Sequence, residues 1–98
     1  MAISDAYLAK IRVGIRIQSD ADFDAELKDI IQECRQDLIA VGVTETAAND
    51  ETDFMIMGAV RSFARWNFPI NERTAQQNRL DYMSNRDELR RSEGYMNG

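Results

Sequence analysis

Residues 23–42, FDAELKDIIQECRQDLIAVG, carry the strongest apolar stripe in this chain of 98 residues. The apolar positions recur at the spacing of one side of a helix. They are Phe23, Leu27, Ile30, Ile31, Cys34, Leu38 and Val41. Gly42 stands where glycine commonly ends a helix, and aspartates at 20, 22 and 24 offer caps or favourable charge at its beginning. The stretch therefore predicts one long amphipathic helix.

Two other segments on either side of this stretch also have helical spacing. The first runs from about residue 5 to 16, after a Ser4 cap, with apolar residues at 8, 11 and 15. The second begins near Asp53 and ends before Pro69, because the residue before a proline is forced out of the helical region. Residues 43–52 are predicted to be a polar connection. Together these segments predict an all-α fold: a small helical bundle with a short N-terminal helix and two long antiparallel helices.

The last quarter of the chain has a much thinner stripe, in which Ala75, Tyr82, Leu89 and Met96 recur every seventh position. We expect a helix to about residue 92 and, because so narrow a stripe does not close a core by itself, an arm that packs either on its own domain or on a neighbouring subunit. The predicted organisation is a helical core domain over 1–70 and an arm and tail over 71–98, used in assembly. The predicted core residues are Leu27, Ile31, Leu38, Val60 and Phe63.

The charge balance is acidic, with 17 acidic and 12 basic side chains and a net charge of −5. Residues 1–53 hold 12 acids and 5 bases, whereas residues 54–98 hold 5 acids and 7 bases. Binding to duplex DNA by charge alone is not expected, because phosphate contacts need a surplus of lysine and arginine. The uneven charge suits head-to-tail contacts between copies, and it equally suits two solvated faces.

The residue types needed for catalysis or metal binding do not form a recognisable arrangement. Histidine is absent, and no nucleophile and base stand in a catalytic pattern, so we expect neither an enzyme nor a cofactor. Asp20, Asp22 and Asp24 resemble the opening of a calcium loop, but Ala25 and Ile31 occupy the positions that need glycine and glutamate. No metal site is predicted. Cys34 is the only cysteine and lies on the apolar stripe, so we expect a buried core residue.

The chain has neither a signal peptide pattern nor an apolar run of membrane-spanning length, so we expect synthesis in the cytoplasm and no membrane partner.

Contacts between subunits are the kind of site that the sequence favours most. Arg61 and Arg65 are most simply a solvated face, with a salt bridge between subunits as the second possibility, and Trp66 belongs either to the core or to a subunit contact. Some of the arginines of the later half are expected to pair across an interface with the acidic start of the long helix, in a neighbouring copy or in an adjoining protein. The candidate interface residues are Trp66, Arg79, Tyr82, Arg86, Leu89, Arg90 and Tyr95.

Three stretches resemble the small head–tail connector (adaptor) proteins of long-tailed bacteriophages. They are the N-terminal helix with its exit, LAKIRVGIRI over 8–17, the capped long helix DADFDAELKDII over 20–31, and the arm with Tyr82 and Leu89 that ends in SEGY over 92–95. The resemblance lies in their order and spacing over nearly the whole chain.

This resemblance implies a virion protein of the phage neck. About twelve copies would form a ring under the portal protein, extend the DNA channel and hold the next neck or tail-completion protein. Genomic DNA would pass through the channel without sequence-specific binding. The alternative is a small helical regulator or interaction module outside the virion that dimerises through the 75–96 stripe.

Overall fold

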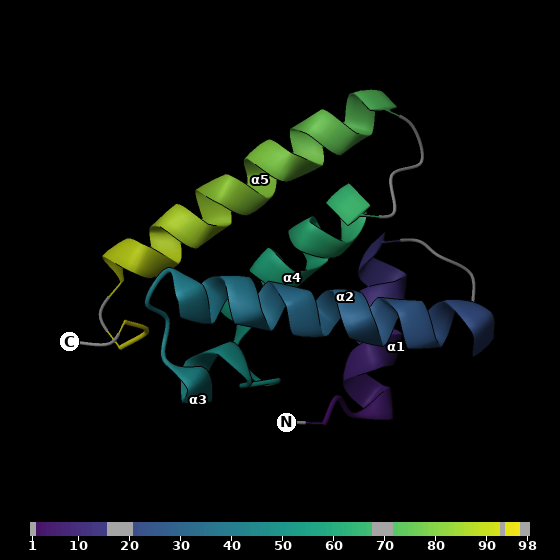
Figure 1. Ribbon diagram of the computed structural model, residues 1–98, viewed down its shortest axis with the longest axis horizontal. Coiled ribbons are helices and arrows are strands. Elements are labelled where there is room, and N and C mark those ends of the chain that lie inside the picture. The colour runs from purple at the N-terminus through teal and green to yellow at the C-terminus, as the bar shows by residue number, and fades with distance from the viewer. Residues whose placement is uncertain (1, 16–20, 68–71, 93, 97–98) are drawn as a thin grey trace.

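The computed structural model describes residues 2–15, 21–67, 72–92 and 94–96. It consists of helices α1 (Asp5–Ile15), α2 (Ala21–Ala40), α3 (Glu45–Ala48), α4 (Phe54–Asn67) and α5 (Glu72–Arg91) (Figure 1). The described residues contain no strand, only an isolated antiparallel bridge between Val43 and Met96. The prediction of an all-α helical bundle is confirmed. Each described helix is too short or too polar to cross a membrane.

Helix α4 is the centre of the arrangement. Its most extensive contact is with α5, which runs antiparallel beside it, and α2 and α1 pack on its other sides (Figure 1). Because α4 is covered from three directions, most of its residues are apolar or small. The buried ones are Ile56, Met57, Ala59, Val60, Ser62, Phe63 and Ala64.

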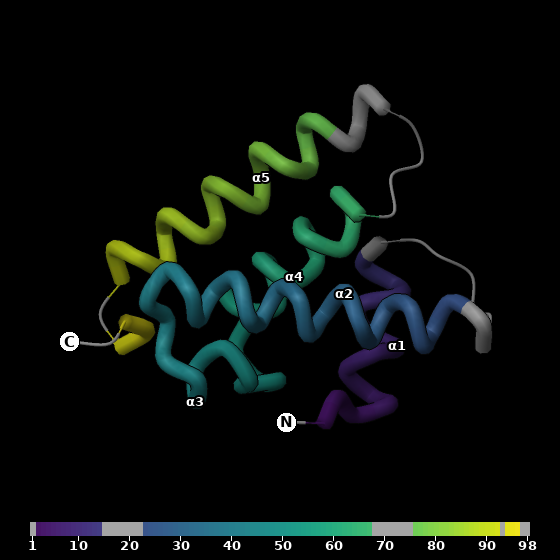
Figure 2. Tube along the Cα trace, in the orientation of Figure 1, coloured from purple at the N-terminus to yellow at the C-terminus, as the bar shows by residue number. Residues whose placement is uncertain are grey.

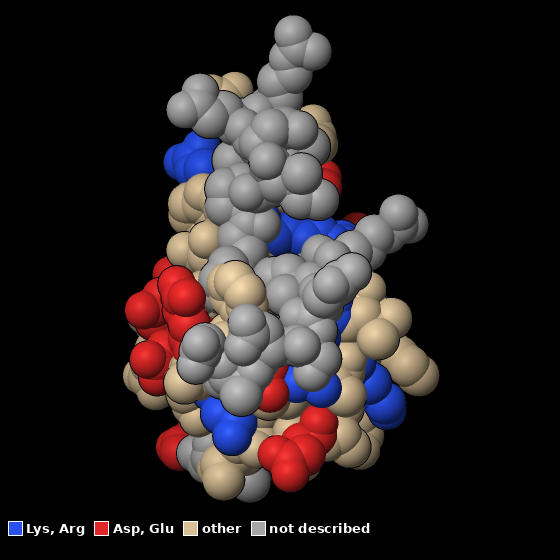
Figure 3. All heavy atoms as spheres, turned by 90° about the vertical axis from the view of Figure 1, so that its right-hand side faces the viewer, with Lys and Arg blue, Asp and Glu red and all other residues tan. Residues whose placement is uncertain are grey.

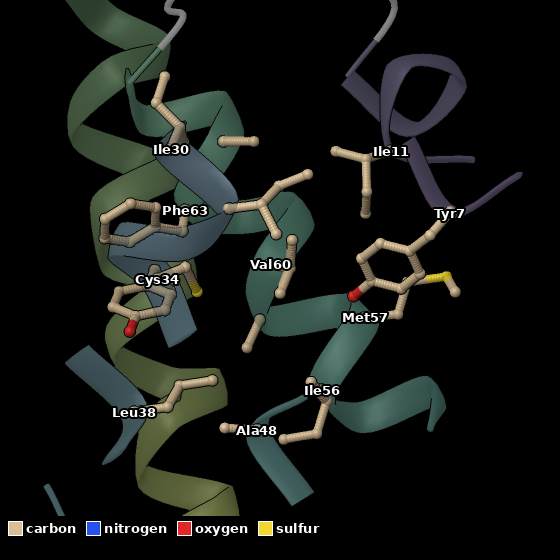
Figure 4. Packing of buried hydrophobic residues seen from close by; sticks show 14 of the residues in the cluster. Tyr7, Ile11, Ile30, Cys34, Leu38, Ala48, Ile56, Met57, Val60 and Phe63 are labelled. Carbon is tan, nitrogen blue, oxygen red and sulfur yellow. The ribbon is translucent and has the colours of Figure 1, made fainter. Parts of the chain in front are cut away.

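A single cluster of buried apolar side chains joins the helices. All five predicted core residues, Leu27, Ile31, Leu38, Val60 and Phe63, are buried in it, as is Cys34. Figure 4 shows side chains of α2 and α4 meeting in the space between these two helices, with those of α1 on the other side of α4. The predictions for the core and for Cys34 are therefore confirmed.

The helix ends follow the chemistry of their sequences. The Ser4 hydroxyl accepts a hydrogen bond from the Tyr7 amide at 3.1 Å, and the Asp53 carboxylate accepts bonds from the first amides of α4 at 2.9 and 3.0 Å. Gly42 has a φ of 109°, and the next amide, of Val43, bonds the Leu38 carbonyl at 3.0 Å. This is the glycine cap predicted for the end of α2. Any residue with a side chain would be strained in this left-handed backbone conformation.

Helix α3 was not predicted, because residues 43–52 contain few apolar side chains. Thr44 caps this single turn by accepting a bond from the Ala47 amide at 3.1 Å, and Val43 and Ala48 are buried. The polar connection is therefore partly folded onto the core.

Of the two expected places for the arm, its own domain or a neighbouring subunit, the described part of α5 occupies the first, while its use in assembly stays a prediction. Tyr82 and Leu89 are both 0% exposed and belong to the same buried cluster as α2 and α4. A stripe of one large side chain every seven residues suffices here, because α4 supplies the other half of the interface. The predicted boundary at residues 70 and 71 falls in 68–71, which lie outside the described residues.

Candidate functional site

The seven candidate interface residues occupy three kinds of environment. Arg79 and Arg90 are exposed, and Trp66, Arg86 and Tyr95 are half-buried. Tyr82 and Leu89 are buried within the chain's own core, so the prediction of an interface role for these two is wrong for the folded subunit. Five of the seven candidate residues therefore keep some surface exposed to solvent, and two do not.

Tyr82 and Arg86 connect α5 to α2 through one carboxylate. The Tyr82 hydroxyl donates a hydrogen bond to Asp37 at 2.5 Å, and the Arg86 guanidinium lies 3.0 Å from the same carboxylate oxygen. The guanidinium also lies 5.8 Å from the centroid of the Tyr82 ring. Burial raises the pKa of the Tyr82 hydroxyl well above its usual range, which keeps it a neutral donor. Arg86, predicted to pair across subunits, thus has its acidic partner within the chain.

The aromatic residues next to this group bridge α4 and α5. The Phe63 ring meets the Tyr82 ring edge-on at 5.0 Å and the Trp66 ring at 5.7 Å. Trp66 is half-buried against the core, and the Arg79 guanidinium lies 6.0 Å from its ring centroid. Trp66 therefore keeps part of its surface exposed, and Arg79 is exposed.

Tyr95 is hydrogen-bonded to Thr44, the cap of α3, and to Asp53, the cap of α4. Its carbonyl accepts a bond from the Thr44 amide at 2.7 Å, and its hydroxyl donates to Asp53 at 2.7 Å. Hydrogen bonding to the Asp53 carboxylate raises the pKa of the Tyr95 hydroxyl. Within the described chain, Tyr95 therefore holds the residues that follow α5 in place.

Arg61 and Arg65 do not simply form a solvated face. The Arg65 guanidinium donates two hydrogen bonds, at 3.1 and 2.6 Å, to the Gly14 carbonyl at the end of α1. A side chain on Gly14 would begin 2.5 Å from the Arg61 Nε atom. The two arginines dock α1 on α4, and the cation at a helix C-terminus is favourable. The sequence shows only two arginines one helical turn apart, and this spacing does not indicate that they hold α1 against α4.

A buried arginine, Arg35, also lies between α1 and α2. It is 1% exposed, lies 3.4 Å from Glu51 and stands 5.7 Å from the Tyr7 ring centroid. Glu51 in turn accepts bonds from the Ser4 amide and hydroxyl at 3.0 and 2.6 Å. Burial works against the Glu51 carboxylate, but these bonds and the Arg35 charge outweigh it and lower the pKa of Glu51. Because Arg35 is paired with Glu51, we interpret the contact as a structural one. The sequence did not indicate that Arg35 is buried.

Among described residues, no three histidine, cysteine or acidic side chains cluster as metal ligands. Asp24 is paired with Arg12 at 2.7 Å, while Asp20 and the side chain of Asp22 lie outside the described residues. Cys34 is 0% exposed and burial raises the pKa of its thiol to about 12, which makes it a poor nucleophile.

Large apolar side chains are exposed on four of the helices. Val13 on α1 is 77% exposed and Phe54 at the start of α4 is 86% exposed. Phe23, Met55 and Leu80 are exposed to a smaller extent. On the face of the molecule shown in Figure 3, acidic and basic side chains of the described residues form small separate groups, without one broad basic area.

A comparison of the chain with protein family models, with curated proteins and with solved structures found no match.

Proposed function

We propose that this chain is a structural protein of a bacteriophage neck, which forms a ring under the portal protein, extends the DNA channel and joins head to tail. The observation that carries the proposal is the order and spacing of the three stretches that resemble head–tail connectors, in a chain whose described residues form helices alone. Val13 and Phe54 are exposed at separate places, which is normal for single apolar side chains on a protein surface and does not itself mark an interface.

The all-α architecture and the order of the three stretches agree with the resemblance to head–tail connector proteins. The acidic balance favours a channel that DNA slides through without adhering, because the phosphate backbone is repelled.

The alternative, a regulator that dimerises through the 75–96 stripe, lacks the surface that it needs. Tyr82 and Leu89, the large side chains of that stripe, are already covered by α2 and α4. A dimer through them would have to open the core first.

A nonsense mutation in the gene of this chain tests the proposal in the phage that encodes it. In a host without a suppressor, we expect DNA-filled heads and free tails that do not join, and purified chain added to this lysate should restore infectious particles. A suppressing host is the control. Complete, infectious virions from the non-suppressing host would contradict a role in the neck.

A further inference from the structure

Residues 94–96, which we call the C-terminal strap, lie against the connection between α2 and α3. Val43 and Met96 form an isolated antiparallel bridge, and the Thr44 amide donates a hydrogen bond to the Tyr95 carbonyl at 2.7 Å. Figure 2 shows the strap, in yellow, beside the turn that follows α2. The strap thus joins the end of the chain to a segment about fifty residues earlier.

One residue of the strap, Tyr95, is bonded to the caps of two helices. Its carbonyl accepts from the amide of Thr44, whose hydroxyl caps α3. Its hydroxyl donates to one carboxylate oxygen of Asp53 at 2.7 Å. The other oxygen of Asp53 accepts the hydrogen bonds from the amides of Met55 and Ile56 that begin α4. Because hydrogen bonds to a carboxylate are about twice as strong as those between neutral groups, Tyr95 helps to orient the cap of α4.

The strap is held less firmly than the helix that precedes it. Gly94 is exposed, has a φ of 92° and has open space beyond its α-carbon, while Tyr95 and Met96 are half-buried. By contrast, Tyr82 and Leu89 of α5 are fully buried. Segments with few buried apolar contacts open at a lower free energy than the core. The strap is therefore able to detach while α5 stays in place.

We propose that the strap is a latch that opens and closes together with the first turns of α3 and α4, while the core between α2, α4 and α5 stays closed. A closed strap holds the Asp53 carboxylate in the orientation that caps α4, and an intact cap in turn presents the carboxylate to Tyr95. The effect is reciprocal, as coupling between two equilibria must be. A change at the end of the chain is thereby transmitted to the start of the central helix. The latch is a property of the folded chain and does not depend on the proposed role in a phage neck.

Native-state hydrogen exchange of the full chain, measured by NMR, tests the latch. Tyr95→Phe removes only the hydroxyl and keeps the ring and the backbone carbonyl. The amides of Thr44, Met55 and Ile56 should then exchange about three- to tenfold faster, the change expected when one hydrogen bond no longer opposes the opening. The amide of Val60, in the middle of α4, should keep its rate.

A matched control and a second variant separate the latch from a general loss of stability. Tyr82→Phe also removes a hydroxyl that donates to a carboxylate, but in the core, so the Thr44 amide should keep its rate. Asp53→Ala removes the other partner of the Tyr95 hydroxyl and should also accelerate exchange at Thr44. Adding Tyr95→Phe to Asp53→Ala should give no further acceleration there, because the shared bond is already absent.

Joint acceleration at both helix starts in Tyr95→Phe, with no further effect in the double variant, supports the latch. Acceleration at Thr44 alone, at the start of α4 alone or at neither shows that the strap and the helix starts open independently, which overturns it. An equal acceleration at Val60 makes the strap part of the core and also overturns it. The same conclusion follows if Tyr82→Phe accelerates exchange at Thr44, or if the two substitutions act additively.

Discussion

Replacement of Leu89 by alanine tests whether α5 belongs to the folded core. Leu89 is 0% exposed, so the substitution removes methyl and methylene groups that lie wholly among other side chains. Changes of this kind cost about 2–5 kcal/mol, because the transfer free energy is lost and a cavity remains. A domain of this size has a total stability on the order of 5–15 kcal/mol. The variant should therefore lose a large part of its free energy of unfolding.

Thermal unfolding followed by circular dichroism measures this loss. For a domain of this length each kcal/mol lowers the melting temperature by about 4–8 °C, so we expect a decrease of roughly 10 °C or more. The matched control is Leu80→Ala on the same helix, which removes the same groups from a side chain that is 56% exposed and should change stability by only about 0.5 kcal/mol. Equal melting temperatures for the wild type and Leu89→Ala would refute the placement of α5 in the core.

Three further predictions concern single side chains. Cys34 should not react with a thiol reagent in mildly alkaline buffer until the protein is unfolded, because burial raises its pKa to about 12; rapid labelling of the native chain would place it at the surface. Folding lowers the pKa of Glu51 below its ordinary 4.5, so its carboxylate stabilises the fold above that pH, and this contribution is lost as the pH falls through the folded pKa. Glu51→Gln should thus be less stable than wild type in denaturant at neutral pH, by a margin that shrinks in acid, whereas a constant margin would exclude the charge as the cause. Arg86→Glu should lower the melting temperature, because it sets a second negative charge beside Asp37. The control is Arg90→Glu, which should leave the melting temperature nearly unchanged, because the Arg90 side chain is 55% exposed. Equal effects of the two substitutions would contradict the pairing of Arg86 with Asp37.

The elements that the sequence predicts well are those with wide apolar stripes. The spacing of Leu27, Ile31 and Leu38 identifies α2 and its buried side, and Ser4, Gly42 and Asp53 mark helix ends through their local hydrogen bonds. These features depend on residues close together in the chain, which is why a pattern in the sequence is sufficient.

The features that were missed depend on contacts between distant residues. The thin stripe of Tyr82 and Leu89 becomes a core surface because α4 faces it, and Arg35 is buried beside Tyr7 and Glu51, which are both distant from it in the chain. Thr44, followed by Glu45 and small residues, is a local signal for the start of α3. It does not predict a helix by itself, because a single turn is too short to show an apolar stripe. The arginine and aromatic residues of the sequence predicted that the candidate interface lies mainly on α5. In the structure, the most exposed large apolar side chains of the described residues are instead on α1 and α4.

The central claim, that copies of this chain join a portal protein as a ring, is tested most directly by the mass and shape of the complex. The purified chain is mixed with the portal protein of the phage that encodes it, and the product is measured by light scattering and imaged by electron microscopy. We expect a ring-shaped layer of this chain on one end of the portal, with a mass that corresponds to about twelve added copies. A compact dimer that leaves the portal unchanged would contradict it.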